Sequence, residues 1–207
     1  MEPVTAHDGS AEHRQQVMRW RKLERARLLA VRMSVGADLR LQWSKSLVAL
    51  VADSADLADR TVSFYWPFRG EPDLRPLAAI VLARGGRCAL PVVVEKGKPL
   101  EFWSWQPGDA LAPGVWNIPI PIIRDTVIPD IVLSPVVGFD ADRYRLGYGG
   151  GFFDRTLAAM AASPLVIGVG YDLARMDTIH PLPHDIAMSL IVTESGVRPI
   201  PAGRQNG

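Results

Sequence analysis

Residues 144–157, YRLGYGGGFFDRTL, combine residue types that are suited to binding a phosphorylated ligand. Four of the five positions from 147 to 151 are glycine, which lets a backbone approach a ligand closely and adopt positive φ angles. The N–H groups of such a loop, with the N-terminus of a helix behind them, form a cradle for anions. Arg145 and Arg155 add positive charge for phosphate oxygens, and Asp154 is a hard oxygen ligand suited to Mg²⁺.

The same residues also fit a tight turn between a strand and a helix, in which Asp154 caps the helix and no ligand binds. The stretch is neither a Walker loop nor a GxGxxG loop, so its pattern alone leaves both interpretations open. The two interpretations differ at Gly150. If phosphates lie against the loop, a β-branched side chain at this position should block the nucleotide.

The flanking segments place this loop at one edge of a sheet. Residues 131–137 are a continuous apolar run, which is typical of a strand that is buried on both faces. Residues 152–162 have the pattern of a helix. A loop that joins such a strand to such a helix is expected at the carboxyl edge of the sheet, where α/β proteins bind ligands.

Helices and strands alternate along the rest of the chain. The pattern predicts helices over residues 14–33, 37–51 and 76–85. It predicts strands over residues 61–68, 87–95, 100–105, 164–172 and 189–195. This alternation predicts a three-layer α/β/α fold with a mostly parallel central sheet.

The first predicted helix has apolar residues at steps of three to five, with arginines in the gaps between them. Such spacing predicts that the apolar residues form the buried face and that the arginines lie outside it. The apolar positions are Val17, Trp20, Leu23, Leu28 and Val31.

The composition is that of one globular domain. The chain has 207 residues, of which 48% are hydrophobic and 22% are charged, and we expect one domain over residues 13–198. Residues 1–12 are expected to be disordered and residues 199–207 to form a loose tail. The net charge of +1 indicates neither a nucleic-acid nor a membrane partner. With a single cysteine, Cys88, and no apolar signal or spanning segment, we expect a soluble cytoplasmic protein.

The glycine-rich stretch resembles the signature of the 5-formyltetrahydrofolate cyclo-ligases, which are also called methenyltetrahydrofolate synthetases. In this family an arginine, a glycine-rich run and two aromatic residues precede Asp-Arg. Other segments resemble family segments in the same order, so the resemblance runs from about residue 14 to residue 195. These segments are FYWPFRGEPD, RGGRCALPVV, VWNIPIP, DIVLSPVVGFD and PLPHDIAMSLIVTE.

The resemblance implies the NagB/RpiA/CoA-transferase-like fold and an enzyme that uses ATP and Mg²⁺. Its reaction would convert 5-formyltetrahydrofolate to 5,10-methenyltetrahydrofolate by phosphorylation of the formyl oxygen, with release of ADP and phosphate. The partners would be the small-molecule folate and ATP, with no nucleic acid or membrane. The protein would be a monomer or a weak homodimer.

The resemblance also implies roles for individual residues. Arg145 and Asp154 would be catalytic, and Asp154 and Asp185 would bind the metal. The folate would contact Glu71, Trp116 and Tyr148. The residues expected to contact ATP are Arg21, Lys22, Arg25, Arg145, Leu146, Gly147, Tyr148, Gly149, Gly150, Gly151, Phe152 and Phe153.

Several of these assignments have a plain structural alternative. Glu71 also fits a solvated loop carboxylate, and Trp116 also fits ordinary core packing. Asp185 also fits a turn residue after Pro183. His184, beside it, is expected to be structural.

The chain departs from the family pattern at a few positions. Phe152 and Phe153 replace the usual pair of tyrosines, Ile120 replaces a polar residue, and Ala174 stands where a glutamine is common. Two alternatives therefore stay open. One is an ATP-dependent paralogue of the same fold that acts on another formylated or amide small molecule. The other is a non-catalytic protein that binds a nucleotide or folate and regulates a partner.

Overall fold

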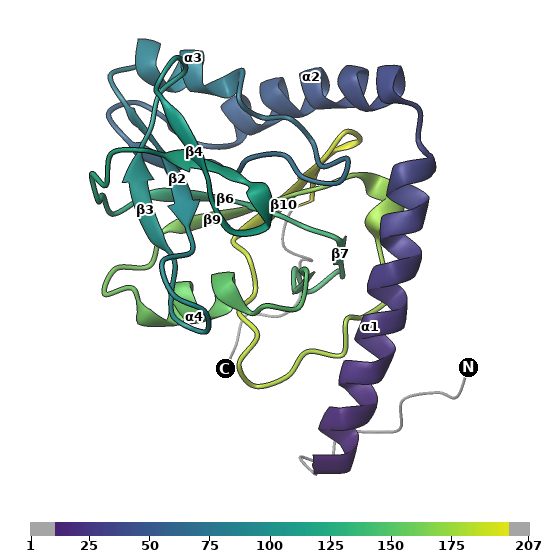
Figure 1. The fold of residues 1–207 in the computed structure, drawn as a ribbon. Coiled ribbons are helices and arrows are strands. Elements are labelled where there is room, and N and C mark those ends of the chain that lie inside the picture. Colours follow the sequence, from purple (N-terminus) through teal and green to yellow (C-terminus); the bar gives the residue numbers. More distant parts are fainter. Residues whose placement is uncertain (1–10, 199–207) are drawn as a thin grey trace, which may run out of the picture.

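A seven-stranded sheet with the strand order β11-β10-β9-β6-β1-β2-β3 organises the fold (Figure 1). The inner strands pair in parallel, and only the two edge strands, β3 and β11, pair antiparallel. The strands are β1 (Thr61–Ser63), β2 (Arg87–Val92), β3 (Glu101–Ser104), β6 (Ile131–Pro135), β9 (Leu165–Val169), β10 (Leu190–Thr193) and β11 (Gly196–Arg198). The prediction of a mostly parallel sheet is confirmed, and the predicted central strand is β6, although it ends at Pro135.

The structure, a computed structural model, describes residues 11–198. The predicted disordered start therefore lies outside the described residues except for Ala11 and Glu12, which are already helical. The predicted tail, residues 199–207, also lies outside them. The helices are α1 (Ala11–Ser34), α2 (Ala37–Ser54), α3 (Leu77–Ala83) and α4 (Phe152–Ala159).

Both faces of the sheet are covered, because alternate residues of each inner strand point to opposite sides. Leu133 and Ile167 pack in the core that α2 and α3 complete. Val132, next along β6, packs on the other side against Phe153 of α4. Figure 1 shows α2 and α3 on one side of the sheet and α4 on the other. This arrangement confirms the three-layer α/β/α prediction.

Helix α1 buries a stripe that matches the predicted apolar face only in part: Val17 and Leu28 are buried as predicted, but Leu23 is not. Its buried residues are Val17, Arg21, Glu24, Leu28 and Arg32, whereas the side of α1 that carries Leu23 is turned outward, with Leu23 61% exposed. On the inner face of α1, Leu28 packs in a small apolar cluster with Leu146 and Ile179, and the buried arginines meet the backbone of loops. For example, Arg21 donates to the Ile179 carbonyl and Arg32 to the Arg69 carbonyl, both at 2.9 Å.

Two small hairpins complete the pocket side of the molecule. β4 (Leu111–Pro113) pairs with β5 (Pro119–Pro121), and a 3₁₀ turn (Val115–Asn117) joins them. β7 (Gly138–Phe139) pairs with β8 (Arg145–Leu146) and lies between β6 and the glycine loop, where the sequence predicted a simple loop. A second 3₁₀ turn covers Asp172–Ala174. Within residues 11–198, no helix is long and apolar enough to cross a membrane.

The connection from α3 to β2 requires a glycine at position 86. A β-carbon there would lie 2.6 Å from the Arg60 carbonyl oxygen and 2.8 Å from Cγ1 of Val81. We expect Gly86→Ala to lower the free energy of unfolding by about 1–3 kcal/mol, because backbone atoms cannot yield as a flexible side chain can. Gly36→Ala is the matched control. A β-carbon there meets no atom within 4 Å, so its effect should stay below about 1 kcal/mol. Urea unfolding followed by circular dichroism measures both, and equal midpoints for the two variants would contradict the prediction.

Candidate active site

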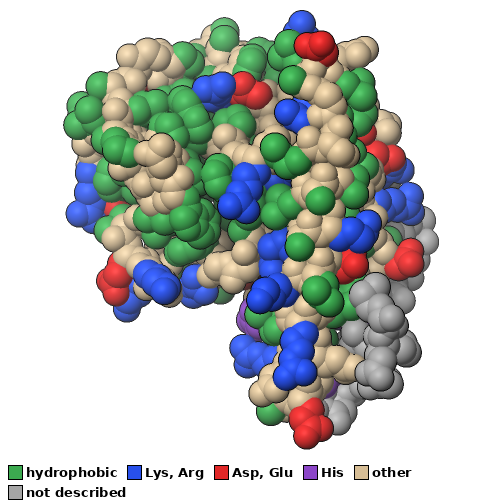
Figure 2. Space-filling view, turned by 45° about the vertical axis from the view of Figure 1, so that its right-hand side comes forward, with side chains coloured by type: hydrophobic (Ala, Val, Ile, Leu, Met, Phe, Trp, Pro, Cys, Tyr) green, Lys and Arg blue, Asp and Glu red, His purple; other side chains and the backbone are tan. Residues whose placement is uncertain are grey.

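A single cleft brings together residues from α1, the β1–α3 connection, the β4–β5 hairpin, the glycine loop and the 184–185 segment. Figure 2 shows Lys and Arg side chains gathered in the hollow beside α1, with hydrophobic side chains opposite. Of the residues proposed from the sequence, Lys22 and Arg155 do not line this cleft; Lys22 is exposed, and Arg155 instead donates to the Gly150 carbonyl at 2.6 Å. All the others line it, namely Arg21, Arg25, Glu71, Trp116, Arg145, Leu146, Gly147, Tyr148, Gly149, Gly150, Gly151, Phe152, Phe153, Asp154 and Asp185.

The glycine loop presents bare backbone to the cleft. Gly149 and Gly151 have φ angles of +93° and +61°, in the region that favours glycine, and Gly151 leads directly into α4. A β-carbon on Gly149 would lie 3.3 Å from the Arg25 guanidinium. Gly150 does not have a positive φ, and a side chain there would meet the Phe152 ring at 2.8 Å. A side chain at Gly149 would therefore be strained by its φ and would press on the Arg25 guanidinium, whereas the backbone at Gly150 is not in the region that favours glycine.

Arg21 and Arg25, one turn apart on α1, bring positive charge to the loop. Nε of Arg25 donates to the Gly147 carbonyl at 2.6 Å and so ties α1 to the loop. Burial and the neighbouring charge of Arg21 lower the pKa of Arg25 from its ordinary value. Two guanidinium groups held this close raise the local positive potential, which favours an anionic ligand.

Arg145 is buried in β8 and is not the exposed loop residue that its surroundings in the sequence suggest. Its Nη2 lies 2.8 Å from Oδ1 of Asp154, and its Nη1 donates to the Ile186 carbonyl at 3.1 Å. Burial lowers its pKa, although the carboxylates of Asp154 and Asp185 oppose this shift. The same Asp154 oxygen accepts from the Ile186 N–H at 3.1 Å. The pair therefore links the glycine loop to the 184–186 segment.

Asp185 is held by Arg21. Nη2 of Arg21 lies 2.5 Å from Oδ2, and the Leu182 N–H donates to the same oxygen at 2.6 Å. Burial by itself would raise the pKa of Asp185, but the hydrogen bonds from Arg21 and Leu182 outweigh it, and the net shift is downward. His184 lines the cleft with an exposed ring.

The acidic groups do not by themselves form a metal cage. Within residues 11–198, no three His, Cys, Asp or Glu side chains are grouped so that they could hold a metal ion. Mg²⁺ commonly uses one or two carboxylates together with phosphate oxygens and water. Asp154 and Asp185 fit that use only if a ligand supplies the remaining oxygens.

Glu71 is buried rather than solvated, so the alternative of an exposed loop carboxylate is wrong. The Tyr148 hydroxyl donates to its Oε1 at 2.9 Å, and the Phe68 N–H donates to its Oε2 at 2.9 Å. Burial raises its pKa to about 7, although the positive charge of Arg32 and both hydrogen bonds oppose the shift. Glu71 is thus poised to change charge near neutral pH.

Arg32 was not identified from the sequence. It is buried on α1, and its Nη2 donates to the Tyr148 hydroxyl at 2.6 Å. Its spacing carries a signal, since positions 21, 25 and 32 fall on one face of a helix. That signal was obscured because the apolar residues of α1 suggested a different buried face.

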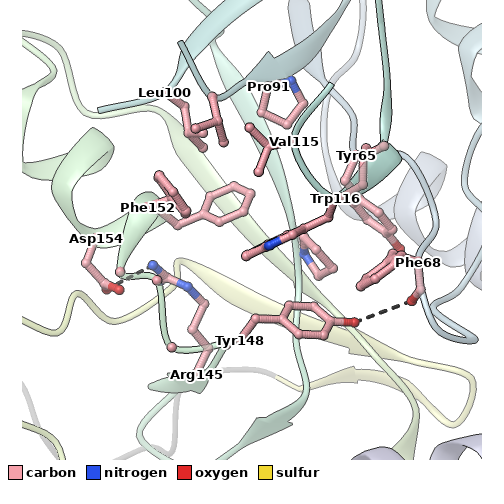
Figure 3. A pocket seen from close by; sticks show the side chains of 18 of the residues that line it. Tyr65, Phe68, Pro91, Leu100, Val115, Trp116, Arg145, Tyr148, Phe152 and Asp154 are labelled. Atoms are coloured by element: carbon pink, nitrogen blue, oxygen red, sulfur yellow. Dashed lines mark hydrogen bonds and ion pairs between the residues drawn. The ribbon is translucent and has the colours of Figure 1, made fainter. Parts of the chain in front are cut away.

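Aromatic side chains form the apolar wall of the cleft. Trp116 is 55% exposed, so core packing is the wrong interpretation for it. Its ring centroid lies 6.4 Å from that of Phe152 and 6.5 Å from that of Tyr148. Figure 3 shows these three rings between Arg145 and Asp154 at one end and Phe68 at the other.

The positions that depart from the family signature do not all lie in the cleft. Phe152, Phe153 and Ile120 line it, and so does Pro119. Ala174 is not among the lining residues and is buried elsewhere, so the departure at this position does not reach the site.

Comparisons with known proteins agree on one family. The model of the 5-formyltetrahydrofolate cyclo-ligase family matches residues 17–194. A relative from Mycolicibacterium smegmatis named 5-formyltetrahydrofolate cyclo-ligase is 33% identical over 177 residues, which cover 82% of this chain and 91% of the relative. A relative of the same name from Escherichia coli is 32% identical over 145 residues, covering 66% of this chain and 79% of its own.

A solved structure shows the same fold. The NMR structure of 5,10-methenyltetrahydrofolate synthetase from Aquifex aeolicus superposes with a TM-score of 0.76 and 27% identity. The match covers 90% of this chain and 96% of the Aquifex chain. The cleft described above therefore lies in a fold that a methenyltetrahydrofolate synthetase shares.

The raised pKa of Glu71 has a consequence for stability. The native state keeps a proton on Glu71 up to about pH 7, whereas the unfolded chain releases it near the ordinary value of 4.5. The unfolded state thus binds fewer protons between these values, and the contribution of Glu71 to stability falls as the pH rises. We expect the stability of the wild type relative to Glu71→Gln to fall by on the order of 3 kcal/mol from pH 4.5 to pH 7.5. Urea unfolding of both proteins across this range measures the difference. If their free energies of unfolding change with pH in parallel, Glu71 is not a buried carboxyl group that titrates in this range.

Proposed function

The chain belongs to the 5-formyltetrahydrofolate cyclo-ligase family, and from that premise we propose that it converts 5-formyltetrahydrofolate to 5,10-methenyltetrahydrofolate with ATP and Mg²⁺. In this reaction the formyl oxygen takes the γ-phosphoryl group of ATP, the second folate nitrogen attacks the formyl carbon, and phosphate leaves. The products are the closed ring, ADP and phosphate. The observation that carries the proposal is that one cleft holds a glycine loop beside guanidinium groups together with an aromatic wall and a buried carboxyl group.

The glycine-loop end of the cleft is suited to the triphosphate. The backbone at Gly147 faces open space, and Gly149 lies against the Arg25 guanidinium, so that a phosphate here could meet both backbone and positive charge. Arg21 and Arg25 point positive charge to the same end, and guanidinium groups bind phosphate through charge-assisted hydrogen bonds. Leu146, Gly150, Phe152 and Phe153 complete this part of the wall.

Arg145 and Asp154 have the catalytic roles in this proposal. The buried guanidinium of Arg145 would stabilise negative charge on the transferring phosphoryl group, since charge interactions are strong where water is excluded. Mg²⁺, when bound with the nucleotide, supplies positive charge that stabilises phosphoryl transfer. Asp154 would hold that ion, and Asp185 would hold Arg21 in place or add a second ligand.

The other end of the cleft is suited to the folate. Trp116 offers a half-exposed indole face against which a fused heterocycle can stack. Glu71 and Tyr148 present hydrogen-bonding groups on an otherwise apolar wall and would orient the ring. The two ends lie side by side, so the formyl oxygen and the γ-phosphate would be held close enough to react.

We also infer a cytoplasmic enzyme that is a monomer or a weak homodimer and needs no nucleic-acid or membrane partner. The net charge of +1 supports this inference. So does Cys88, a buried free thiol whose pKa burial raises to about 12.

An absorbance assay tests the activity. Purified protein with 5-formyltetrahydrofolate, ATP and Mg²⁺ is expected to produce the near-ultraviolet band of methenyltetrahydrofolate. Omission of ATP, or removal of Mg²⁺ with EDTA, should abolish the signal. ATP binding without this band would point instead to another formylated or amide substrate. Absence of both would contradict the proposed function.

Gly149→Val tests the phosphate cradle. The φ of +93° strains any side chain by about 1–3 kcal/mol, and the new side chain would also press on the Arg25 guanidinium. We expect ATP affinity to fall at least roughly tenfold, whereas folate affinity should change less. Gly97→Val is the matched control, because Gly97 has a φ of +82° and lies outside the cleft. Isothermal titration of ATP and of folate into both variants and the wild type measures these affinities. If Gly149→Val binds ATP as tightly as the wild type does, the loop is only a turn and does not bind phosphate.

A further inference from the structure

We propose that Arg32 is a positioning residue that orients the Tyr148 hydroxyl and the 68–71 turn, and thereby keeps Glu71 as an aligned carboxylate facing the substrate. This inference rests on the proposed function for the identity of that substrate. Arg32 is absent from the lining of the cleft, so its effect must pass through the residues that it holds.

Arg32 is 4% exposed, and burial of a guanidinium is unfavourable unless its donors are used. Its three nitrogens reach three separate segments. Nε donates to the Arg69 carbonyl at 2.9 Å, and Nη1 donates to the Val136 carbonyl at 3.4 Å. Nη2 donates to the Tyr148 hydroxyl at 2.6 Å. One side chain of α1 therefore fixes the substrate-side turn, the end of β6 and the glycine loop relative to one another.

The direction of the hydrogen bonds follows from the chemistry of the groups. A guanidinium can only donate, so the Tyr148 oxygen must accept from Arg32. The hydroxyl proton is then directed elsewhere, and Oε1 of Glu71 accepts it at 2.9 Å. The alternative acceptor, the Phe68 carbonyl, lies farther away at 3.4 Å. The result is an ordered relay from Arg32 through Tyr148 to Glu71.

The same guanidinium also stabilises the backbone that carries Glu71. Arg69 and Gly70 have φ angles of +48° and +73°, and this conformation is unfavourable for the arginine. Arg32 helps to hold this conformation by donating a hydrogen bond to the Arg69 carbonyl. The turn closes on itself, since the Glu71 N–H donates to the Phe68 carbonyl at 3.2 Å and the Phe68 N–H donates to Oε2 of Glu71. Both carboxyl oxygens of Glu71 are thus aligned.

Charged and titratable groups from several elements face Glu71. These are Arg32 from α1, Tyr148 from the glycine loop and Tyr65 from the segment after β1. Arg40 from α2 lies beside the neighbouring Gly70. Burial raises the pKa of Glu71, and the charge of Arg32 is the largest influence that opposes it. Loss of Arg32 would raise the pKa of Glu71 further, so Glu71 would keep its proton, and act as a hydrogen-bond donor, over a wider range of pH.

The test uses stability first, because it needs no substrate. For the wild type and for each arginine variant, the free energy of unfolding is compared with that of the same protein carrying Glu71→Gln, by urea unfolding from pH 4.5 to pH 9. The pH window is the range over which this difference changes. Arg32→Met is expected to move the upper end of this pH window upward by at least about one unit. Arg32→Lys should move it less, because it keeps the charge. Arg27→Met is the matched control. Arg27 lies on the same helix and pairs with Glu24 away from the cleft, so the window should not move.

Tyr148→Phe provides a second route to the same answer if Arg32→Met does not fold. It removes the hydroxyl of the relay but keeps both charged groups, Arg32 and Glu71, and it should also move the window upward. An unchanged window in Arg32→Met, or in Tyr148→Phe when the former is unfolded, would overturn the proposal.

Kinetics then connect the relay to the substrate. We expect the acidic limb of kcat/KM for 5-formyltetrahydrofolate to move upward in Arg32→Met, with partial recovery at higher pH. A purely structural role would instead lower activity equally at every pH and would count against the proposal. The two proposals can be told apart. If the wild type lacks cyclo-ligase activity but the stability window moves in the Arg32 variant, the proposed function is wrong and the role of Arg32 in positioning Glu71 stands.

Discussion

The site depends on the burial of positive charge along one face of α1. A guanidinium that leaves water must find acceptors for its donors and, where possible, a negative partner. Arg21 meets Asp185 and two carbonyls, whereas Arg32 meets two carbonyls and the Tyr148 hydroxyl. These acceptors belong to segments that are far apart in the sequence. The need to satisfy the arginines therefore fixes the loops of the cleft relative to α1.

The same constraint divides the cleft into two chemically different ends. Arg21, Arg25 and Arg145 gather where the glycine loop offers bare backbone, so this end favours an anion. At the other end, aromatic side chains exclude water around Glu71, whose pKa burial raises to about 7. Tyr148 belongs to both ends, because it is part of the glycine loop and its hydroxyl contacts Glu71. The proposed reaction would use this juxtaposition, since it brings a phosphoryl donor and a fused heterocycle to one place.

Unfavourable backbone conformations occur in two turns that carry or flank cleft residues. Trp116 and Asn117 have φ angles of +56° and +59°, and Arg69 has +48°. Such conformations persist only where surrounding contacts hold them, and they are frequent at binding sites. The turn that carries Trp116 places its indole in the cleft rather than in the core, and the turn at Arg69 places Glu71 beside Tyr148. The functional side chains thus owe their direction to unfavourable local conformations.

The sequence by itself determined the layers, the central strand and the glycine-loop part of the cleft, and the family resemblance added most of its other members, although Lys22 and Arg155 lie outside it. The apolar runs of strands and the apolar spacing of helices are local properties of the sequence. The glycine run is contiguous with Arg145 and Asp154. These features could therefore be predicted. The tertiary structure decided which face of α1 is buried, that Glu71 is desolvated, and that Arg32 holds Tyr148. These depend on contacts such as that between positions 32 and 148, whose partners are 116 residues apart. Hydrophobic spacing located Val17 and Leu28 on the buried face of α1 but missed the buried arginines, because it cannot show that a guanidinium will meet backbone carbonyls of distant loops.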